Sequence, residues 1–326
     1  MEEPPRILLS STEVLFHGLK LLGFDEKRQN RVNRKKNLAR FRSHYASDPL
    51  VYAVLLERLQ TTTNEKANVN AYIDKLGVTS FQSYYFMAIH LLACYPTEEE
   101  AEAVWSKEAG PCSKSWSAWS WKIIECISHL VADVIYWPDT WSNPDNPQDN
   151  TETIFILTVD GVHCPIEEPT LPSFEQNEKY YSHKYNAAGL DYELGISIFT
   201  QRCVWCAGPY PAGKNDISIF KHKLLPKMQE ARNNSAKNVQ FRAIGDKGYR
   251  GVRDFLSVPS SQDTPEVRDF KSRALSRHET FNGRLKNFDC LDVRFRHSID
   301  KHRMCFHAVL VIVQMQLDNG SPLFVV

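Results

Sequence analysis

Three acidic residues, Asp160, Asp246 and Glu279, stand where their carboxylates could meet and bind divalent cations. Asp160 directly follows T-I-F-I-L-T-V at 153–159, and Asp246 follows F-R-A-I-G at 241–245. Both runs are short and largely apolar, and the first is rich in β-branched and aromatic residues, so both predict strands. Because neighbouring parallel strands end at the same edge of a sheet, we expect the two aspartates to lie close together.

The third acid lies on a predicted helix from about Glu266 to Phe288. One face of this helix, which we expect to meet the core, carries Ala274, Phe281, Leu285 and Phe288. The opposite face carries Glu279, Asn282, Gly283 and Lys286. Glu279 should therefore point away from the core, with a base nearby for a phosphate backbone.

A group of three carboxylates suits Mg²⁺, which binds a few of them and completes its shell with waters and substrate phosphate. Two such ions can activate a water or a 3′-hydroxyl and stabilise the leaving oxygen of an in-line displacement. Without metal, crowded acids repel one another, and their pKa values should rise. Asp160-Gly161 is also a common turn pair, so a plain turn is the alternative at that position.

Basic residues that could contact phosphates accompany these acids. The net charge is zero, so a nucleic-acid contact must come from local patches. Lys27–Arg42 carries eight bases and no acid, and we expect its Arg34, Lys35 and Lys36 to contact phosphate. A merely solvated basic face is the alternative. The other expected DNA contacts are Lys184, Lys247, Arg277 and Lys286.

From residue 151 onward, the order of elements predicts an α/β domain with a mixed sheet. Strands at 153–159, Leu190–Phe199 and Arg202–Ala207 follow one another quickly, which favours hairpins. A helix that opens at Asp216 comes next. The strand at 241–245 must therefore cross over and lie parallel to an earlier one.

The preceding residues, 1–140, predict an all-α region. A helix at Glu98–Lys107, the turn Ala109-Gly110-Pro111 and a helix from Ser113 or Ser115 to about Tyr136 have the outline of a helix-turn-helix. A small helical bundle explains this pattern equally well, because the second helix carries few bases. Trp137–Asn150 is rich in Pro, Asn and Asp and predicts a linker, followed by a domain at 151–326.

Other features limit the classes of protein that the chain could belong to. No apolar run is long enough to span a membrane, and the acidic N-terminus lacks the features of a signal peptide, so we expect an intracellular protein. The pair Cys203 and Cys206 lies in a predicted strand without a second such pair, which favours structural cysteines. A zinc site built from His297, His302, Cys305 and His307 is a weaker alternative, because its spacing matches no standard finger.

Four motifs in combination resemble the DDE transposase superfamily. They are D-G-V-H at 160–163, G-P-Y-P-A-G-K-N-D at 208–216, G-D-K-G-Y-R-G at 245–251 and R-H-E-T-F-N-G-R-L-K at 277–286. The resemblance is to the Harbinger-like (DDE Tnp4-type) group, related to bacterial insertion-sequence transposases, and covers about 150–325. The spacing from Asp246 to Glu279, 279 − 246 = 33 residues, is close to the one that gives this class its D-D-35-E label.

The resemblance implies an RNase H-like fold, a catalytic metal-binding triad of Asp160, Asp246 and Glu279, and two Mg²⁺ or Mn²⁺ ions. Asp216 matches an additional aspartate of this group, although Asp is also a favoured helix N-cap. The resemblance further implies cleavage and joining of DNA, with transposon ends and target DNA as partners. A separate Myb-like DNA-binding protein, a homo-oligomer when active, and a nuclear location (or a cytoplasmic one in a prokaryote) are also expected.

Three functions are therefore open. The favoured one is a metal-dependent DNA transposase or endonuclease. A domesticated descendant that binds nucleic acid or a partner without cutting ranks second, because all three acids are present. An α/β phosphohydrolase acting on a small phosphate ester ranks third, because the basic segment and Lys286 favour a polyanion.

Overall fold

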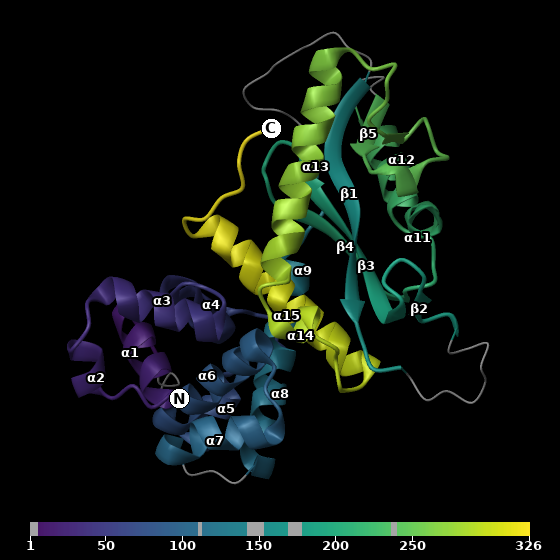
Figure 1. The fold of residues 1–326 in the computed structure, drawn as a ribbon. Helices are drawn as coiled ribbons and strands as arrows, with labels where there is room; N and C mark the ends of the chain where they lie inside the picture. The colour runs from purple at the N-terminus through teal and green to yellow at the C-terminus, as the bar shows by residue number, and fades with distance from the viewer. Residues whose placement is uncertain (1–5, 110–112, 142–152, 169–177, 236–239) are drawn as a thin grey trace. The chain divides into compact units, whose positions relative to one another are not determined.

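The computed structural model describes residues 6–109, 113–141, 153–168, 178–235 and 240–326, drawn in Figure 1. They form two compact units. The helical unit comprises Met1–Val134, Leu285–Asp292 and His297–Ser321. The sheet unit comprises Ile135–Arg284, Val293–Arg296 and Pro322–Val326. Most of the linker predicted at Trp137–Asn150 lies outside the described residues, as does the turn at Gly110-Pro111.

The helical unit begins with a helix that its sequence caps well, since the Ser10 side chain accepts from the Glu13 N–H and the Glu13 side chain accepts from the Ser10 N–H. Its helices are α1 (Ser11–Leu21), α2 (Glu26–Asn30), α3 (Arg34–Tyr45), α4 (Pro49–Thr61), α5 (Asn70–Leu76), α6 (Val78–Cys94), α7 (Glu98–Ala109), α8 (Ser113–His129), α9 (Val131–Val134), α14 (Asp289–Asp292) and α15 (Ile299–Asp318). Many of their aromatic and aliphatic side chains are buried.

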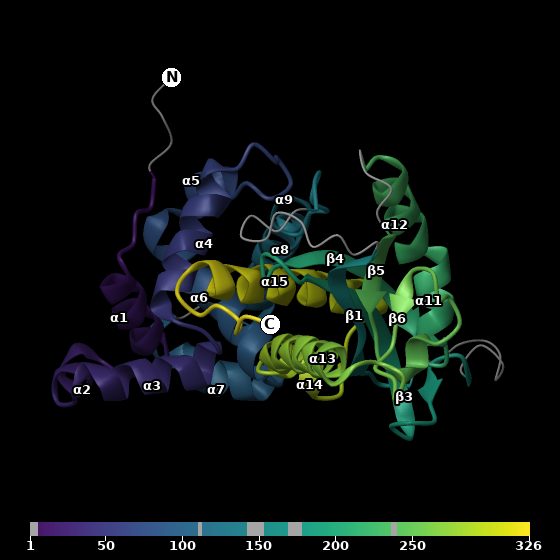
Figure 2. The same cartoon turned by 90° about the horizontal axis from the view of Figure 1, so that it is seen from above.

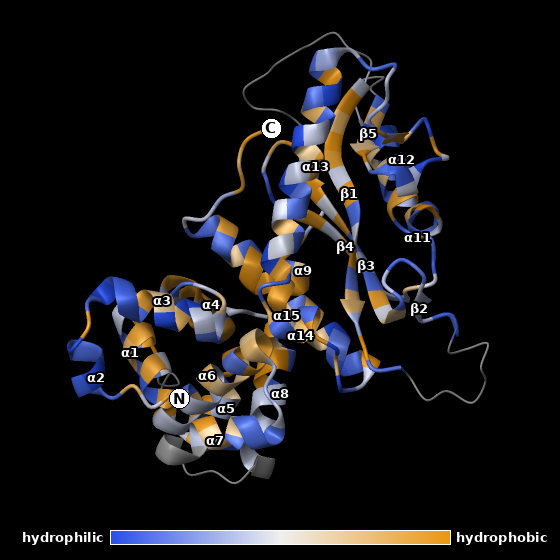
Figure 3. Ribbon diagram, viewed as in Figure 1, coloured by the Kyte–Doolittle hydropathy of each residue, from blue (hydrophilic) through white to orange (hydrophobic). Residues whose placement is uncertain are grey.

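The last helix departs from the predicted division of the chain. We expected a domain at 151–326 ending in a helix at 308–316, but α15 starts earlier, at Ile299, where Ser298 caps it, and belongs to the helical unit. The residues from Ala308 to Val313 are all fully buried, and α15 packs on α8 and α4. Figure 3 shows the hydrophobic stretch along this helix. An apolar helix of this kind needs cover on most of its faces, and the helical unit supplies it.

The helix-turn-helix outline fits the structure less well than the bundle alternative. The helix α8, which would have to read DNA, packs against both α6 and α15. Its Trp116, Trp121, Ile123, Ile124 and Ile127 are buried. A helix enclosed on several faces cannot lie in a DNA groove in this arrangement.

The sheet unit contains β1 (Thr153–Pro165), β2 (Tyr181–Ser182), β3 (Ala187–Ser197), β4 (Cys203–Pro211), β5 (Gln240–Ile244) and β6 (Leu256–Ser257). In the described part of the chain they join one mixed sheet in the order β2-β3-β1-β5-β6, with β4 also paired to β3. The pairs β1–β3 and β3–β4 are antiparallel, whereas β1–β5 and β5–β6 are parallel. The predicted hairpins and parallel crossover are thus confirmed. The two-residue strand β6 lies in a segment that we predicted to be a loop.

The first strand is longer than predicted. β5 pairs with β1 only as far as Thr158 opposite Ile244, but β3 continues to pair as far as Pro165 opposite Gly189. Asp160 therefore lies inside β1 rather than at its end. It stands just beyond the point where the parallel neighbour stops, and Figure 3 shows β1 hydrophobic where β5 runs beside it. β4 likewise extends through Pro211 into the predicted loop.

Helices cover the two faces of this sheet, as Figure 2 shows from above. One face packs on α11 (Asp216–His222) and α12 (Leu224–Asn233) through a core that includes Val159, Phe220 and Met228. We predicted a single helix here, but the backbone turns aside at Lys223 (φ −123°, ψ −63°), and Pro226 then fits in the first turn of α12.

The other face carries α13 (Pro265–Leu285). Its predicted core residues Ala274, Phe281, Leu285 and Phe288 are all fully buried, which confirms that face, although the helix ends before Phe288. His278 Nδ1 lies 2.8 Å from Thr158 Oγ1 on β1, so the helix is fixed along this strand. Among the described residues, we find no helix that combines the length and the apolar character needed to cross a bilayer.

Candidate metal-binding site

Asp160 and Asp246 occupy matching positions relative to the parallel strands β1 and β5. The register pairs Thr158 with Ile244, and each aspartate lies two residues beyond its member of that pair. Asp246 caps the short 3₁₀ helix η1 (Lys247–Tyr249), and its Oδ1 accepts from the Gly248 N–H at 2.8 Å. Asp160 Oδ1 accepts from the Gly161 N–H at 2.8 Å. One oxygen of each carboxylate is thus oriented by the backbone.

A third aspartate, Asp216 at the first position of α11, lies against these two. A Cβ added to Gly161 would stand 3.2 Å from Asp216 Oδ1. A Cβ added to Gly248 would stand 3.0 Å from Asp216 Oδ2 and 3.1 Å from Asp246 Oδ1. The two glycines therefore leave the space into which the carboxylates fit. Asp216 is not the N-cap that we weighed as its alternative role, because Asn215 holds that position.

Burial and mutual repulsion change the pKa of the buried acids. Burial, followed by the charges of Asp246 and Asp216, raises the pKa of Asp160 to about 7. Burial, followed by the charges of Asp191 and Asp246, raises the pKa of Asp216 to about 6. Such shifts are what crowded carboxylates show when no cation neutralises them. A cation bound beside Asp160 and Asp216 would favour their ionised forms.

The helix α13 meets Asp160 through an amide rather than through Glu279. Asn282 Nδ2 donates to Asp160 Oδ2 at 3.0 Å. Glu279 is exposed, and no ion pair or side-chain hydrogen bond joins it to another described residue. It lies three residues before Asn282, which makes the two neighbours on the helix surface. The structure thus brings Asp160, Asp216 and Asp246 together and leaves the Glu279 carboxylate one helical turn from the residue that contacts Asp160.

Tyr249 explains the rest of the G-D-K-G-Y motif. Its ring packs edge-on against Phe220 in the core, with centroids 6.3 Å apart. A Cβ on Gly245 would lie 2.9 Å from the Tyr249 Cβ, so glycine is required there. The buried Tyr249 hydroxyl has no hydrogen-bond partner among the residues that the structure describes, and burial, followed by the charges of Glu193, Asp216, Asp160 and Asp246, raises its pKa.

Two further acids line the same region, and the sequence reasoning missed both. Glu193 lies opposite Gly161 in the β1–β3 pairing and is buried, and burial raises its pKa to about 8. Trp205 Nε1 donates to its Oε1 at 3.0 Å. Asp191 Oδ1 accepts a hydrogen bond from His163 Nδ1 at 2.8 Å, and the His163 ring stacks on Tyr185 with centroids 4.1 Å apart. The signal in the sequence was the alternation of acids in L-D-Y-E-L at 190–194, within a strand that is otherwise apolar.

The expected DNA-contacting bases have different outcomes. Lys184 is exposed, and its interaction with Tyr185, followed by the charges of Asp160 and Asp216, raises its pKa, so it lies near the acids. Lys247 is exposed next to Asp246. Arg34, Lys35 and Lys36 are exposed in the first turn of α3. These positions remain compatible with phosphate contacts.

Arg277 and Lys286 are less suited to the predicted contact with DNA. Arg277 is fully buried and donates to the Ser197 and Ile198 carbonyl oxygens at 2.7 and 3.3 Å, so it joins α13 to β3 instead of facing DNA. The prediction for Arg277 is therefore wrong in this conformation. Lys286 lies beyond the end of α13, and its Nζ donates to the Leu291 carbonyl oxygen at 2.6 Å. It is half-buried rather than extended beside Glu279.

The spacing of possible ligand atoms limits which metal could bind. Among the described residues, the acid cluster does not bring three ligand atoms within 4.8 Å of one another. The same is true of the weaker zinc alternative, which consists of His297, His302, Cys305 and His307. No such group includes Cys203 or Cys206. An ion held by the acids would have to draw them together or bind some through water. Mg²⁺ and Mn²⁺ commonly keep waters and accept such open carboxylate sets.

Comparisons with known proteins give no family for this chain. No family model matches it, and neither the curated proteins nor the solved structures contain a match.

Proposed function

We propose that the protein is a metal-dependent DNA transposase or endonuclease of the Harbinger-like DDE type. The observation that carries the proposal is the matched position of Asp160 and Asp246 on parallel neighbours, with Asp216 packed against two glycines beside them. Asp160 and Asp216 are partly buried beside the exposed Asp246, and a divalent cation would relieve the repulsion that raises their pKa. The high pKa of Asp160 and of Asp216 supports the same conclusion.

The arrangement of strands supports an RNase H-like fold. Read through β4, the sheet order is β4-β3-β1-β5-β6, with three antiparallel strands first and two parallel strands after a helical crossover. In chain order this is a 3-2-1-4-5 sheet, with Asp160 in the first strand and Asp246 two residues after the end of the fourth. The order follows from short hairpins and one crossover, so other α/β enzymes could share it, and the acids are needed to favour this fold.

Each residue has a proposed role. Asp160 and Asp246 hold the cations, Mg²⁺ or Mn²⁺, and Asp216 and Glu279 complete the site from α11 and α13. Bound there, the ions would activate water or a 3′-hydroxyl and stabilise the leaving oxygen. Asn282 orients Asp160 by its hydrogen bond. Lys184 and Lys247, exposed near the acids, would bind the phosphate backbone.

The alternatives remain a domesticated descendant that binds nucleic acid without cutting, and a phosphohydrolase acting on a small ester. The exposed Glu279 and the open spacing of the carboxylates are compatible with the first of these. The bases Arg34, Lys35 and Lys36 favour a polyanion over a small ester. A homo-oligomer, a Myb-like partner and a nuclear location are parts of the same proposal.

The proposal is tested by cleavage of supercoiled plasmid and of labelled element ends with Mn²⁺. The wild-type protein should nick DNA, and Glu279→Gln should lose at least about 100-fold of the rate, because one metal-binding carboxylate is removed from a two-metal site. The thermal unfolding of Glu279→Gln should be unchanged, because the side chain is exposed. Asp269→Asn, an exposed acid on the same helix, is the control. Normal cutting by Glu279→Gln would remove Glu279 from the site.

A further inference from the structure

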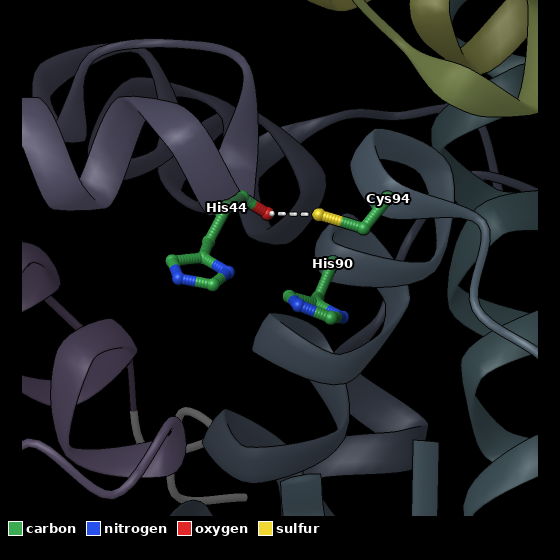
Figure 4. Close-up of side chains that lie close together, drawn as sticks. All are labelled: His44, His90 and Cys94. Atoms are coloured by element: carbon green, nitrogen blue, oxygen red, sulfur yellow. Dashed lines mark hydrogen bonds between the residues drawn. The ribbon is translucent and has the colours of Figure 1, made fainter. Parts of the chain in front are cut away.

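A second group of metal-binding side chains lies in the helical unit, apart from any residue used above. His44 is in the last turn of α3, and His90 and Cys94 are four residues apart on α6. Residues four apart lie on one face of a helix. One ligand atom from each of the three lies within 4.8 Å of the other two. Figure 4 shows the two imidazole rings side by side, with the Cys94 sulfur above them.

Neighbouring rings hold His90 in place, but one of its buried ring nitrogens has no hydrogen-bond partner among the described residues. It is only 4% exposed, and its ring packs against His44, Tyr45 and Trp105, with centroids 5.8, 5.9 and 5.4 Å away. Its Nδ1 is buried without a hydrogen-bond partner among the described residues. A bound metal ion would give this buried histidine the polar partner that it lacks here.

Cys94 is positioned to supply the third ligand. Its Sγ donates to the His44 carbonyl oxygen at 3.4 Å, which keeps the thiol beside the histidine pair. Burial, followed by the charge of Asp289, raises the pKa of Cys94 to about 11. The thiol is therefore protonated by itself, but a metal ion would displace the proton. The nearby Asp289 carboxylate adds negative charge that favours a cation.

We propose that His44, His90 and Cys94 bind a zinc ion that joins α3 to α6. Two imidazoles and one thiolate suit a borderline-soft ion such as Zn²⁺, and disfavour Mg²⁺, which prefers oxygen ligands. With Zn–N of about 2.1 Å and Zn–S of about 2.3 Å, tetrahedral ligand atoms lie roughly 3.5 Å apart. Side-chain rotations that move each ligand atom by about 1 Å would bring the three atoms to these separations. A water completes the fourth position.

Such an ion would stabilise the helix that carries the basic cluster. Arg34, Lys35 and Lys36 lie in the first turn of α3, and His44 lies in its last turn. Metal binding contributes directly to folding when the ligands come from separate elements. The zinc ion would thus fix the position of α3 on α6 within the helical unit, whether or not the protein cuts DNA.

The test uses the full-length chain after removal of metal with a chelator. Titration with Co²⁺ should give a near-ultraviolet thiolate-to-cobalt absorption band that saturates at one ion per chain and disappears when Zn²⁺ is added. Cys94→Ala should abolish the band, and His44→Ala, at a half-buried position, should weaken Co²⁺ affinity at least about tenfold. Cys126→Ala, which removes another buried thiol of the helical unit, should leave the band unchanged. Asp160→Asn with Asp246→Asn should also leave it unchanged.

Thermal unfolding gives the second readout. At a free Zn²⁺ concentration one hundred times the wild-type Kd, the Tm of the wild-type protein should rise by roughly 5 °C, and the Tm of Cys94→Ala or His44→Ala should rise by about half as much or less. Three results would each overturn the proposal. They are a cobalt–thiolate band that persists in Cys94→Ala, full Co²⁺ affinity in His44→Ala, and an equal Zn²⁺ effect on the Tm of the variants.

Discussion

At the scale of single residues, glycines beside the acid cluster leave the space that its carboxylates occupy. Gly161, Gly245 and Gly248 each stand where a Cβ would meet a carboxylate or the Tyr249 ring within about 3 Å. The D-G and G-D-x-G-Y motifs therefore describe a packing arrangement in which carboxylates replace side chains. Gly283 is different, because a Cβ there would meet nothing within 4 Å. Gly283→Ala is therefore a suitable control substitution on α13.

The first prediction concerns the pH dependence of stability. The folded pKa of Asp160, about 7, lies above its ordinary value of 3.8. The folded state therefore keeps a proton that the unfolded state has lost, and the stability contributed by Asp160 falls as the pH rises from about 4 through 7. Asp160→Asn does not titrate, so in a chelator its free energy of unfolding should exceed that of the wild type by roughly 4 kcal/mol at pH 8 and by little at pH 4.

Urea unfolding at both pH values, with and without Mg²⁺, measures this difference. Added Mg²⁺ should stabilise the wild type more than Asp160→Asn, because the variant has lost a ligand. Equal stability of the two proteins at pH 8 in chelator would show that Asp160 is neither crowded nor desolvated.

At the scale of elements, α3 shows a charge distribution that costs stability. Its first turn holds Arg34, Lys35 and Lys36 and no acid, although the N-terminus of a helix favours negative charge. Replacing all three by Ala should therefore raise the free energy of unfolding, by about 1 kcal/mol. The same triple variant should bind DNA more weakly on all sequences, with a log–log salt slope flatter by roughly two to three units.

The control for α3 is a triple Ala variant of Lys20, Lys66 and Lys75, exposed bases scattered over the helical unit. It loses the same charge but should keep the wild-type salt slope. If the α3 variant also keeps that slope, its bases form only a solvated face. If it loses preference for one DNA sequence over another, α3 reads bases and does more than contact phosphate.

Much of the sheet unit could be predicted from local patterns, because each element carries its own signal. The apolar run at 153–159, the hairpin spacing and the core face of α13 were all recognisable. The end of β1 was not, because it depends on how far β3 continues to pair, which is a long-range property. The roles of Asn282 and Arg277 were missed for a similar reason. Their contacts join positions 122 and 80 residues apart, and no local pattern reports them.

At the scale of the whole molecule, the chain crosses between its two units more than once. Residues after α13 return to the helical unit, where α15 packs on α4 and α8 from the first part of the chain. A boundary placed from a Pro-rich linker assumes that each domain is one continuous segment. The position of an apolar helix is set instead by which unit can bury it, and the sequence does not state that.

The central claim is that the acid cluster of the sheet unit binds divalent cations. Calorimetric or paramagnetic titration of the full-length chain with Mn²⁺ tests it most directly. We expect saturable binding by the wild type, at least about 30-fold weaker binding by Asp160→Asn with Asp246→Asn, and about tenfold weaker binding by Gly248→Ala, whose Cβ would crowd the carboxylates of Asp216 and Asp246. Gly283→Ala should bind as the wild type does. Mn²⁺ binding by the double Asn variant at wild-type affinity would contradict the account.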